Sequence, residues 1–77
     1  MTESVPTVVK ELAAKYFRVA PGAVDLTTPI EKAGDSLQLS ELVIALEQRF
    51  DIMIEDNAVA RAKLLGDLVP LIEERLR

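Results

Sequence analysis

Residues 34–37, Gly34-Asp35-Ser36-Leu37, open the segment that decides the fold, a periodic run that continues to about Phe50. Ser36 follows a long loop and precedes this run, so we expect it at or next to the N-cap of a helix. In that position its hydroxyl can accept from the free amides of the first turn. A phosphate attached to the same oxygen would meet those N–H groups and the positive end of the helix dipole.

The helix that Ser36 opens has two faces with different chemistry. Five apolar residues with spacings of three, four and seven predict a core-facing stripe: Leu39, Leu42, Val43, Leu46 and Phe50. Leu37 and Ile44 project almost opposite this stripe, and their neighbours on that side are Ser40, Glu41, Glu47 and Gln48. Two apolar side chains on an acidic, solvent-facing surface indicate a docking patch, although single exposed apolar residues are also common without any role.

The segment before Gly34 predicts one helix and one long loop. Helical spacing of apolar residues runs from about Ser4, a plausible N-cap, to Phe17, with Pro6 in the first turn. The sequence Ala20-Pro21-Gly22 is expected to stop this helix. The loop then continues to about Asp35, and three apolar residues are expected to pin it to the bundle: Val24, Leu26 and Ile30.

The segment after Phe50 predicts two more helices. A break at residues 51–54 precedes a short helix that Glu55 or Asp56 caps and that ends near Arg61. The last helix carries an apolar stripe of Leu65, Leu68, Val69, Ile72 and Leu76. If Asp67 is its N-cap, Pro70 lies in the first turn, whereas a start near Leu65 would place a kink at Pro70. The expected fold is all-α, one domain over residues 1–77: a small antiparallel bundle of three main helices plus one short helix, with the long loop between helices one and two.

Composition excludes several classes of function. The 77 residues contain no cysteine and no histidine, which removes disulfides, thiolate or imidazole metal ligands and the usual nucleophile–base pairs. No metal site is expected, because the carboxylates of Asp51, Glu55 and Asp56 are typical of solvated helix caps. No apolar run reaches membrane-spanning length and no signal peptide is visible, so we expect a cytoplasmic monomer.

Charge points to the kind of partner. The net charge is −4, which argues against nucleic acid because phosphate binding needs a basic patch. Eight of the 13 acidic residues lie between residues 25 and 56, where only Lys32 and Arg49 oppose them. A partner with a basic surface would therefore be steered to the helix that Ser36 opens.

Three interpretations of Ser36 compete. The letters Gly34-Asp35-Ser36-Leu37 spell the motif that names the GDSL esterases, but the histidine base of that chemistry is missing, so no enzyme activity is expected. The second interpretation is a serine that only caps a helix. The third is covalent attachment of a prosthetic group.

The third interpretation gains support from a family resemblance. Asp35-Ser36-Leu37, the run 41–47 (Glu41-Leu42-Val43-Ile44-Ala45-Leu46-Glu47), Phe50-Asp51-Ile52 and Gly66-Asp67 together resemble the acyl carrier proteins over nearly the whole chain. The resemblance implies that Ser36, flanked by Asp35 and Leu37, carries 4′-phosphopantetheine derived from coenzyme A, whose thiol holds acyl groups as thioesters. It also implies that Leu37, Glu41, Ile44 and Glu47 contact partner enzymes, in agreement with the face found from helical spacing, to which Ser40 and Gln48 also belong.

The implied partners are a phosphopantetheinyl transferase and acyl-transferring or ketosynthase-type enzymes with basic docking surfaces. An acyl chain could retreat between the helices, where Ala45, Ala58, Ala62 and Met53 could permit a cavity, although each of these residues is equally typical of an ordinary core. The alternatives that remain open are an aminoacyl or peptidyl carrier and a helical interaction module whose serine is never modified.

Several positions depart from the pattern typical of the resembled family. The typical residues would be an aromatic near Thr28, leucine at Lys32, glycine at Ala33, acids at Gln38 and Gln48, valine at Ser40 and threonine at Leu64. Arg49 dilutes the acidity of the docking helix further. These departures favour a carrier dedicated to one pathway, such as polyketide or other secondary-metabolite synthesis, over the general carrier of fatty acid synthesis.

Overall fold

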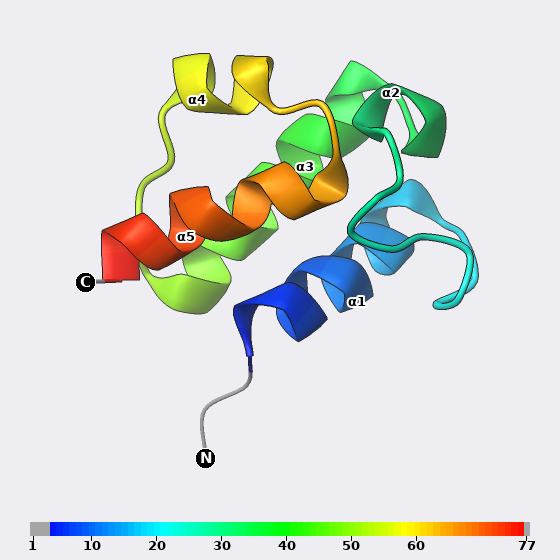
Figure 1. Cartoon of the computed structure of the whole chain (residues 1–77), viewed down its shortest axis with the longest axis horizontal. Coiled ribbons are helices and arrows are strands. Elements are labelled where there is room, and N and C mark those ends of the chain that lie inside the picture. Colours follow the sequence, from blue (N-terminus) through cyan, green and yellow to red (C-terminus); the bar gives the residue numbers. More distant parts are fainter. Residues whose placement is uncertain (1–3, 77) are drawn as a thin grey trace.

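The computed structural model describes residues 4–76 and is helical throughout, with no strand among these residues (Figure 1). Its elements are α1 (Val5–Phe17), α2 (Ile30–Ala33), α3 (Ser36–Phe50), α4 (Asp56–Arg61), the 3₁₀ helix η1 (Leu65–Asp67) and α5 (Leu68–Leu76). The predicted all-α bundle with three main helices is confirmed. Within residues 4–76, the helices fall short of the length and apolar character that a bilayer crossing requires.

Helix α1 begins where the sequence predicts. The Ser4 hydroxyl accepts a hydrogen bond from the Thr7 amide at 3.3 Å, and Pro6 lies in the first turn. The helix ends at Phe17 because Arg18 adopts a left-handed conformation with φ of 59°, so its amide donates back to carbonyls of the last turn. The chain therefore leaves the helix two residues before Ala20-Pro21-Gly22, and Arg18 is the residue that stops it.

The loop between α1 and α3 contains a helix that the sequence pattern did not predict. Helix α2 is a single turn, and its first residue, Ile30, is buried in the core. Main-chain hydrogen bonds join the loop to a distant segment, from Ile30 to the Lys63 carbonyl, from Leu65 to the Thr28 carbonyl and from Gly66 to the Leu26 carbonyl. Below, residues 26–30 and 63–66 are called the paired loops.

The start of the last helix combines the two predicted alternatives. Leu65 begins η1, α5 follows at Leu68, and Pro70 is the third residue of α5, where its missing amide costs no intrahelical bond. Asp67 precedes α5 as predicted, but its carboxylate accepts from the amides of Lys63 and Leu64, at 2.9 and 3.0 Å. Asp67 therefore fixes one of the paired loops.

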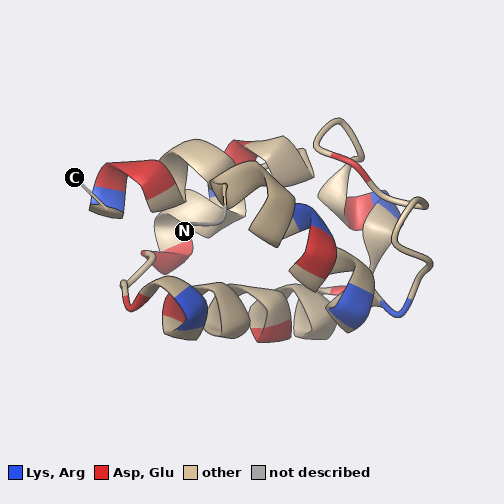
Figure 2. Ribbon diagram, turned by 90° about the horizontal axis from the view of Figure 1, so that it is seen from below, with Lys and Arg blue, Asp and Glu red and all other residues tan. Residues whose placement is uncertain are grey.

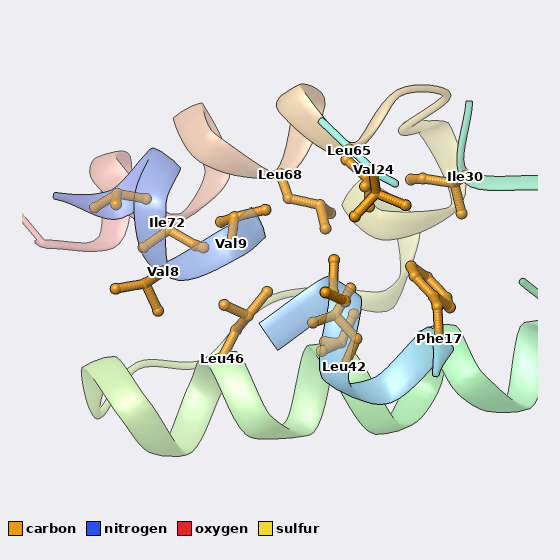
Figure 3. Packing of buried hydrophobic residues seen from close by; sticks show 14 of the residues in the cluster. Val8, Val9, Phe17, Val24, Ile30, Leu42, Leu46, Leu65, Leu68 and Ile72 are labelled. Atoms are coloured by element: carbon orange, nitrogen blue, oxygen red, sulfur yellow. The ribbon is translucent and has the colours of Figure 1, made fainter. Parts of the chain in front are cut away.

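The core lies where α1, α3, η1 and α5 meet, and Val24 and Ile30 from the long loop complete it (Figure 3). On α3, Leu42, Val43 and Leu46 are buried as predicted, while Leu39 and Phe50 are half-buried against the cluster. Leu76, the last residue of the apolar stripe predicted for the final helix, is 48% exposed and lies outside the core. The core face of α3 is thus fixed, and its opposite face is left to solvent.

Candidate functional site

The first turn of α3 is held by a reciprocal pair of hydrogen bonds. The Asp35 carboxylate accepts from the Gln38 amide at 2.8 Å, and the Gln38 side-chain oxygen accepts from the Asp35 amide at 3.1 Å. This arrangement is a capping box with Asp35 as N-cap. The expectation that the Ser36 hydroxyl accepts from first-turn amides is wrong, because Asp35 performs that function and Ser36 is the first residue inside the helix.

The Ser36 side chain consequently takes no part in capping the helix. Its side chain is exposed, and its hydroxyl makes no hydrogen bond with any residue in the described range 4–76. The amides of Ser36 and Leu37 also have no partner among these residues, as expected for the first two amides of a helix. An accessible hydroxyl beside two free N–H groups and a positive dipole end fits a covalently attached phosphate.

Gly34 has no side chain, and the capping box occupies the space that a side chain at this position would fill. A Cβ built on Gly34 would overlap with the side-chain oxygen of Gln38 and with the ring of Phe17, which is only 4% exposed. The backbone at Gly34 is extended, with φ of −175°, a conformation that any residue adopts. The requirement for glycine is therefore one of space, and it ties the start of α3 to the end of α1.

Ser36 stands between two open grooves. The first groove has a volume of about 540 Å³ and extends to Ser36. Its opposite side is formed by Pro29 and Ile30 at the start of α2 and by Ala62 and Leu64 in the segment after α4. The second groove, of about 390 Å³, runs between α3 and α4. Its lining residues are Ser36, Leu39, Ser40, Val43, Ile44, Glu47, Asp56 and Val59. A flexible group attached to Ser36 therefore has two surfaces within reach.

The four residues predicted to permit a cavity are dispersed. Ala62 lines the first groove, and Ala58 lines a separate groove of about 140 Å³ beside α5. Ala45 is half-buried in α3. Met53 is 77% exposed, so the prediction that it borders a cavity is wrong.

The outer face of α3 carries the residues predicted to dock partners, and most of them are accessible. Leu37 is 69% exposed and Ile44 is 53% exposed, as their helical positions predicted. Ser40, Glu41 and Gln48 are exposed as well. Together with Glu47 these residues are called the docking face below. Figure 2 shows red segments along α3 and also a blue segment, in agreement with the position of Arg49 in the last turn of this helix.

Glu47 differs from the rest of the docking face. Its side chain is half-buried, and one carboxylate oxygen accepts a hydrogen bond from the Ile54 amide at 2.8 Å. The segment that follows α3 is thereby fastened to the helix, a link for which the sequence offered no signal. Glu47 also lines the second groove.

Two carboxylates outside the docking face are more acidic than usual. The backbone amides of Leu64 and Lys63 lower the pKa of Asp67 below the ordinary 3.8. The Thr27 hydroxyl and amide, with smaller contributions from Thr28, lower the pKa of Asp25 in the same direction. Both residues act on loops that border the site. The described residues 4–76 contain no cluster of three or more metal-ligating side chains.

Known proteins resemble this chain over most of its length. The family described as "Phosphopantetheine attachment site" matches residues 7–72. An acyl carrier protein of a Sulfurovum species is 39% identical over 67 residues, which cover 84% of this chain and 89% of the relative. An acyl carrier protein of Campylobacter fetus is 34% identical, with 84% of this chain and 87% of the relative covered. A third, from Phenylobacterium zucineum, is 50% identical over 42 residues, about half of each chain.

Proposed function

The chain belongs to the phosphopantetheine-binding acyl carrier protein family, and we propose that Ser36 is the residue that bears its prosthetic group. Proteins of this family are carriers and not catalysts, and their phosphopantetheine is covalently attached. The observation that supports Ser36 is its hydroxyl, which is exposed and has no partner in the range 4–76 although it stands at a helix start. A serine that served only as a helix cap would have that oxygen engaged.

In the attachment step, the Ser36 oxygen forms a bond to the pantetheine-bearing phosphorus of coenzyme A. The bond from that phosphorus to the departing adenosine 3′,5′-bisphosphate breaks, and the hydroxyl proton passes to a base of the transferase. The free amides of Ser36 and Leu37 would favour the negative charge of a phosphodiester on the Ser36 oxygen. When bound, the group supplies a thiol at the end of a flexible arm, which holds acyl groups as thioesters.

The family acts with a phosphopantetheinyl transferase and acyl-handling enzymes, and we propose that these dock on the outer face of α3. Leu37 and Ile44 offer exposed apolar contacts on either side of Glu41, whose charge attracts a basic surface. Because one carrier visits several enzymes, such contacts need to form quickly and remain weak, which suits a small face of mixed character.

We further propose a carrier dedicated to one biosynthetic pathway, with acyl cargo resting in the first groove. The support is the dilution of acidity on α3, where Gln38 and Gln48 are neutral and Arg49 is basic. The first groove is lined mainly by apolar residues and opens beside Ser36, so it suits a chain poorly soluble in water. The assignment is tested by exchanging this carrier with a general fatty-acid carrier in two reconstituted pathways, one for fatty acid synthesis and one for polyketide synthesis, and measuring product formation in each.

The attachment site is tested by intact mass. The apo-protein, incubated with coenzyme A and a broad-specificity phosphopantetheinyl transferase, is expected to gain one phosphopantetheinyl group. Ser36→Ala is expected to gain none, whereas Ser4→Ala, which removes a serine at the start of a different helix, is expected to gain one. A full gain by the Ser36→Ala variant would refute the proposal.

A further inference from the structure

We propose that Gln38 is a positioning residue for phosphopantetheine attachment, because its side chain holds the start of α3 in a form that leaves the Ser36 oxygen uncommitted. The inference rests on the proposed attachment at Ser36. Gln38 itself neither bears the prosthetic group nor belongs to the docking face.

The first turn has a limited supply of acceptors, and Gln38 determines how they are used. With the Gln38 oxygen on the Asp35 amide at 3.1 Å, the Asp35 carboxylate is directed to the Gln38 amide at 2.8 Å. Both groups are then engaged in the capping box, and neither is bonded to the Ser36 hydroxyl. If the side-chain oxygen were missing, the Asp35 amide would lose its partner, and the first turn would keep only the bond from the main-chain amide of residue 38 to the Asp35 carboxylate. Held by one bond instead of a reciprocal pair, the Asp35 carboxylate could turn toward the Ser36 hydroxyl, for which it is a strong acceptor.

The surroundings make the Gln38 conformation specific. The side chain is half-buried, and it lies where a Cβ on Gly34 would be, next to the buried ring of Phe17. Packing on this side and the hydrogen bond to Asp35 on the other restrict the rotamers of Gln38. The start of α3 is thus fixed relative to α1 before any enzyme binds, which lowers the ordering cost when a transferase docks.

Two substitutions of similar length separate the hydrogen bond from simple packing. Gln38→Met keeps an unbranched side chain and a high helix propensity but removes the acceptor for the Asp35 amide. Gln38→Glu keeps an acceptor, and glutamate supports a capping box as glutamine does. Glu73→Ala, on the exposed side of α5, is the matched control for an ordinary surface change in a helix.

The experiment measures kcat/KM for modification of the full-length apo-protein by coenzyme A and a broad-specificity transferase. Gln38→Met is expected to lower kcat/KM about fivefold, the factor that corresponds to the loss of one helix cap of about 1 kcal/mol. Gln38→Glu and Glu73→Ala are expected to stay within about twofold of the wild type. Amide hydrogen exchange of the apo-protein provides a second readout, in which the Asp35 amide loses protection in Gln38→Met and keeps it in Gln38→Glu.

Three results would overturn parts of the reasoning, and they are distinguishable. A Gln38→Met variant that loses Asp35 protection yet is modified at the wild-type rate removes the positioning role. A Gln38→Glu variant as slow as Gln38→Met shows that the acceptor is not the cause and overturns the inference too. A wild-type protein that gains no group at Ser36 overturns the proposed function itself.

Discussion

Replacing Glu47 by alanine should destabilise the protein, whereas the same change at Glu41 should not, although both are glutamates on the docking face. The Glu47 carboxylate accepts from the Ile54 amide at 2.8 Å, and its main-chain carbonyl accepts from the Ile52 amide at 3.0 Å. Glu47 therefore holds the chain reversal after α3 through two different groups. Glu41 is exposed and makes no side-chain hydrogen bond with the described residues 4–76.

The magnitude follows from the kind of hydrogen bond that is lost. Bonds to charged groups contribute about 1.5–3 kcal/mol to stability, and the half-buried position of Glu47 favours the lower end because water competes. We therefore expect Glu47→Ala to lower the free energy of unfolding by about 1.5 kcal/mol, or about 6–12 °C in melting temperature for a domain of this size. Glu47→Gln keeps an acceptor and is expected to lose less, and Glu41→Ala should remain within about 0.5 kcal/mol.

Circular dichroism at increasing temperature or urea concentration measures these differences on the apo-protein. Equal stability of Glu47→Ala and Glu41→Ala would show that the link to Ile54 does not hold the fold and would refute the reasoning. The distinction also matters for studies of docking. A charge reversal at Glu47 changes the stability of the fold and the charge of the docking face together, whereas a reversal at Glu41 tests docking alone.

Two further predictions concern the paired loops. Gly66→Ala should lower the free energy of unfolding by about 1–3 kcal/mol, because the added Cβ would lie 2.8 Å from the main-chain oxygen of Leu26. Gly22→Ala, where the added Cβ would meet open space, should be neutral or slightly stabilising in the same melting experiment, and equal effects of the two substitutions would contradict the close approach at Gly66. Asp67→Asn should be less stable than the wild type at neutral pH, and this difference in stability should shrink in melts at acid pH. Because the pKa of Asp67 is lowered in the folded protein, its contribution to stability is present above pH 3.8 and is lost as the pH falls through the lower native pKa; a difference that persisted well below that range would contradict the assigned role.

The sequence predicted the long helices well because their signal is local and repeated. Helices α1 and α3 span 13 and 15 residues, over which apolar spacing leaves little choice of face. The same spacing predicted that Leu37 and Ile44 would be exposed, which the structure confirms. Helix α2 had no such signal. It has four residues, and the hydrogen bonds beside it come from a segment more than 30 residues further along the chain.

The hydrogen bond expected of the Ser36 hydroxyl shows a different kind of failure, because a signal for the actual cap was present. Asp35 is as good an N-cap as serine, and Gln38 follows it by three residues, which is the spacing of a capping box. The prediction placed Ser36 at or next to the N-cap, and the one-residue difference between these two positions decides which side chain caps the helix. The Glu47 link and the Asp67 link had no comparable signal, because each joins a carboxylate to main-chain amides whose positions depend on the folded loops.

The difference between N-cap and first helical residue bears directly on the function. A serine at the N-cap would bond its oxygen to a first-turn amide, and modification would then have to break a stabilising contact. With Asp35 as the cap, the proposed modification of the Ser36 oxygen leaves the helix start intact, and the amides of Ser36 and Leu37 remain available to a phosphate there. Loading and unloading of the arm therefore need not be coupled to the stability of α3. Under the proposed attachment at Ser36, this independence suits a carrier that passes through apo, holo and acylated forms, and the Asp35–Gln38 pair provides it.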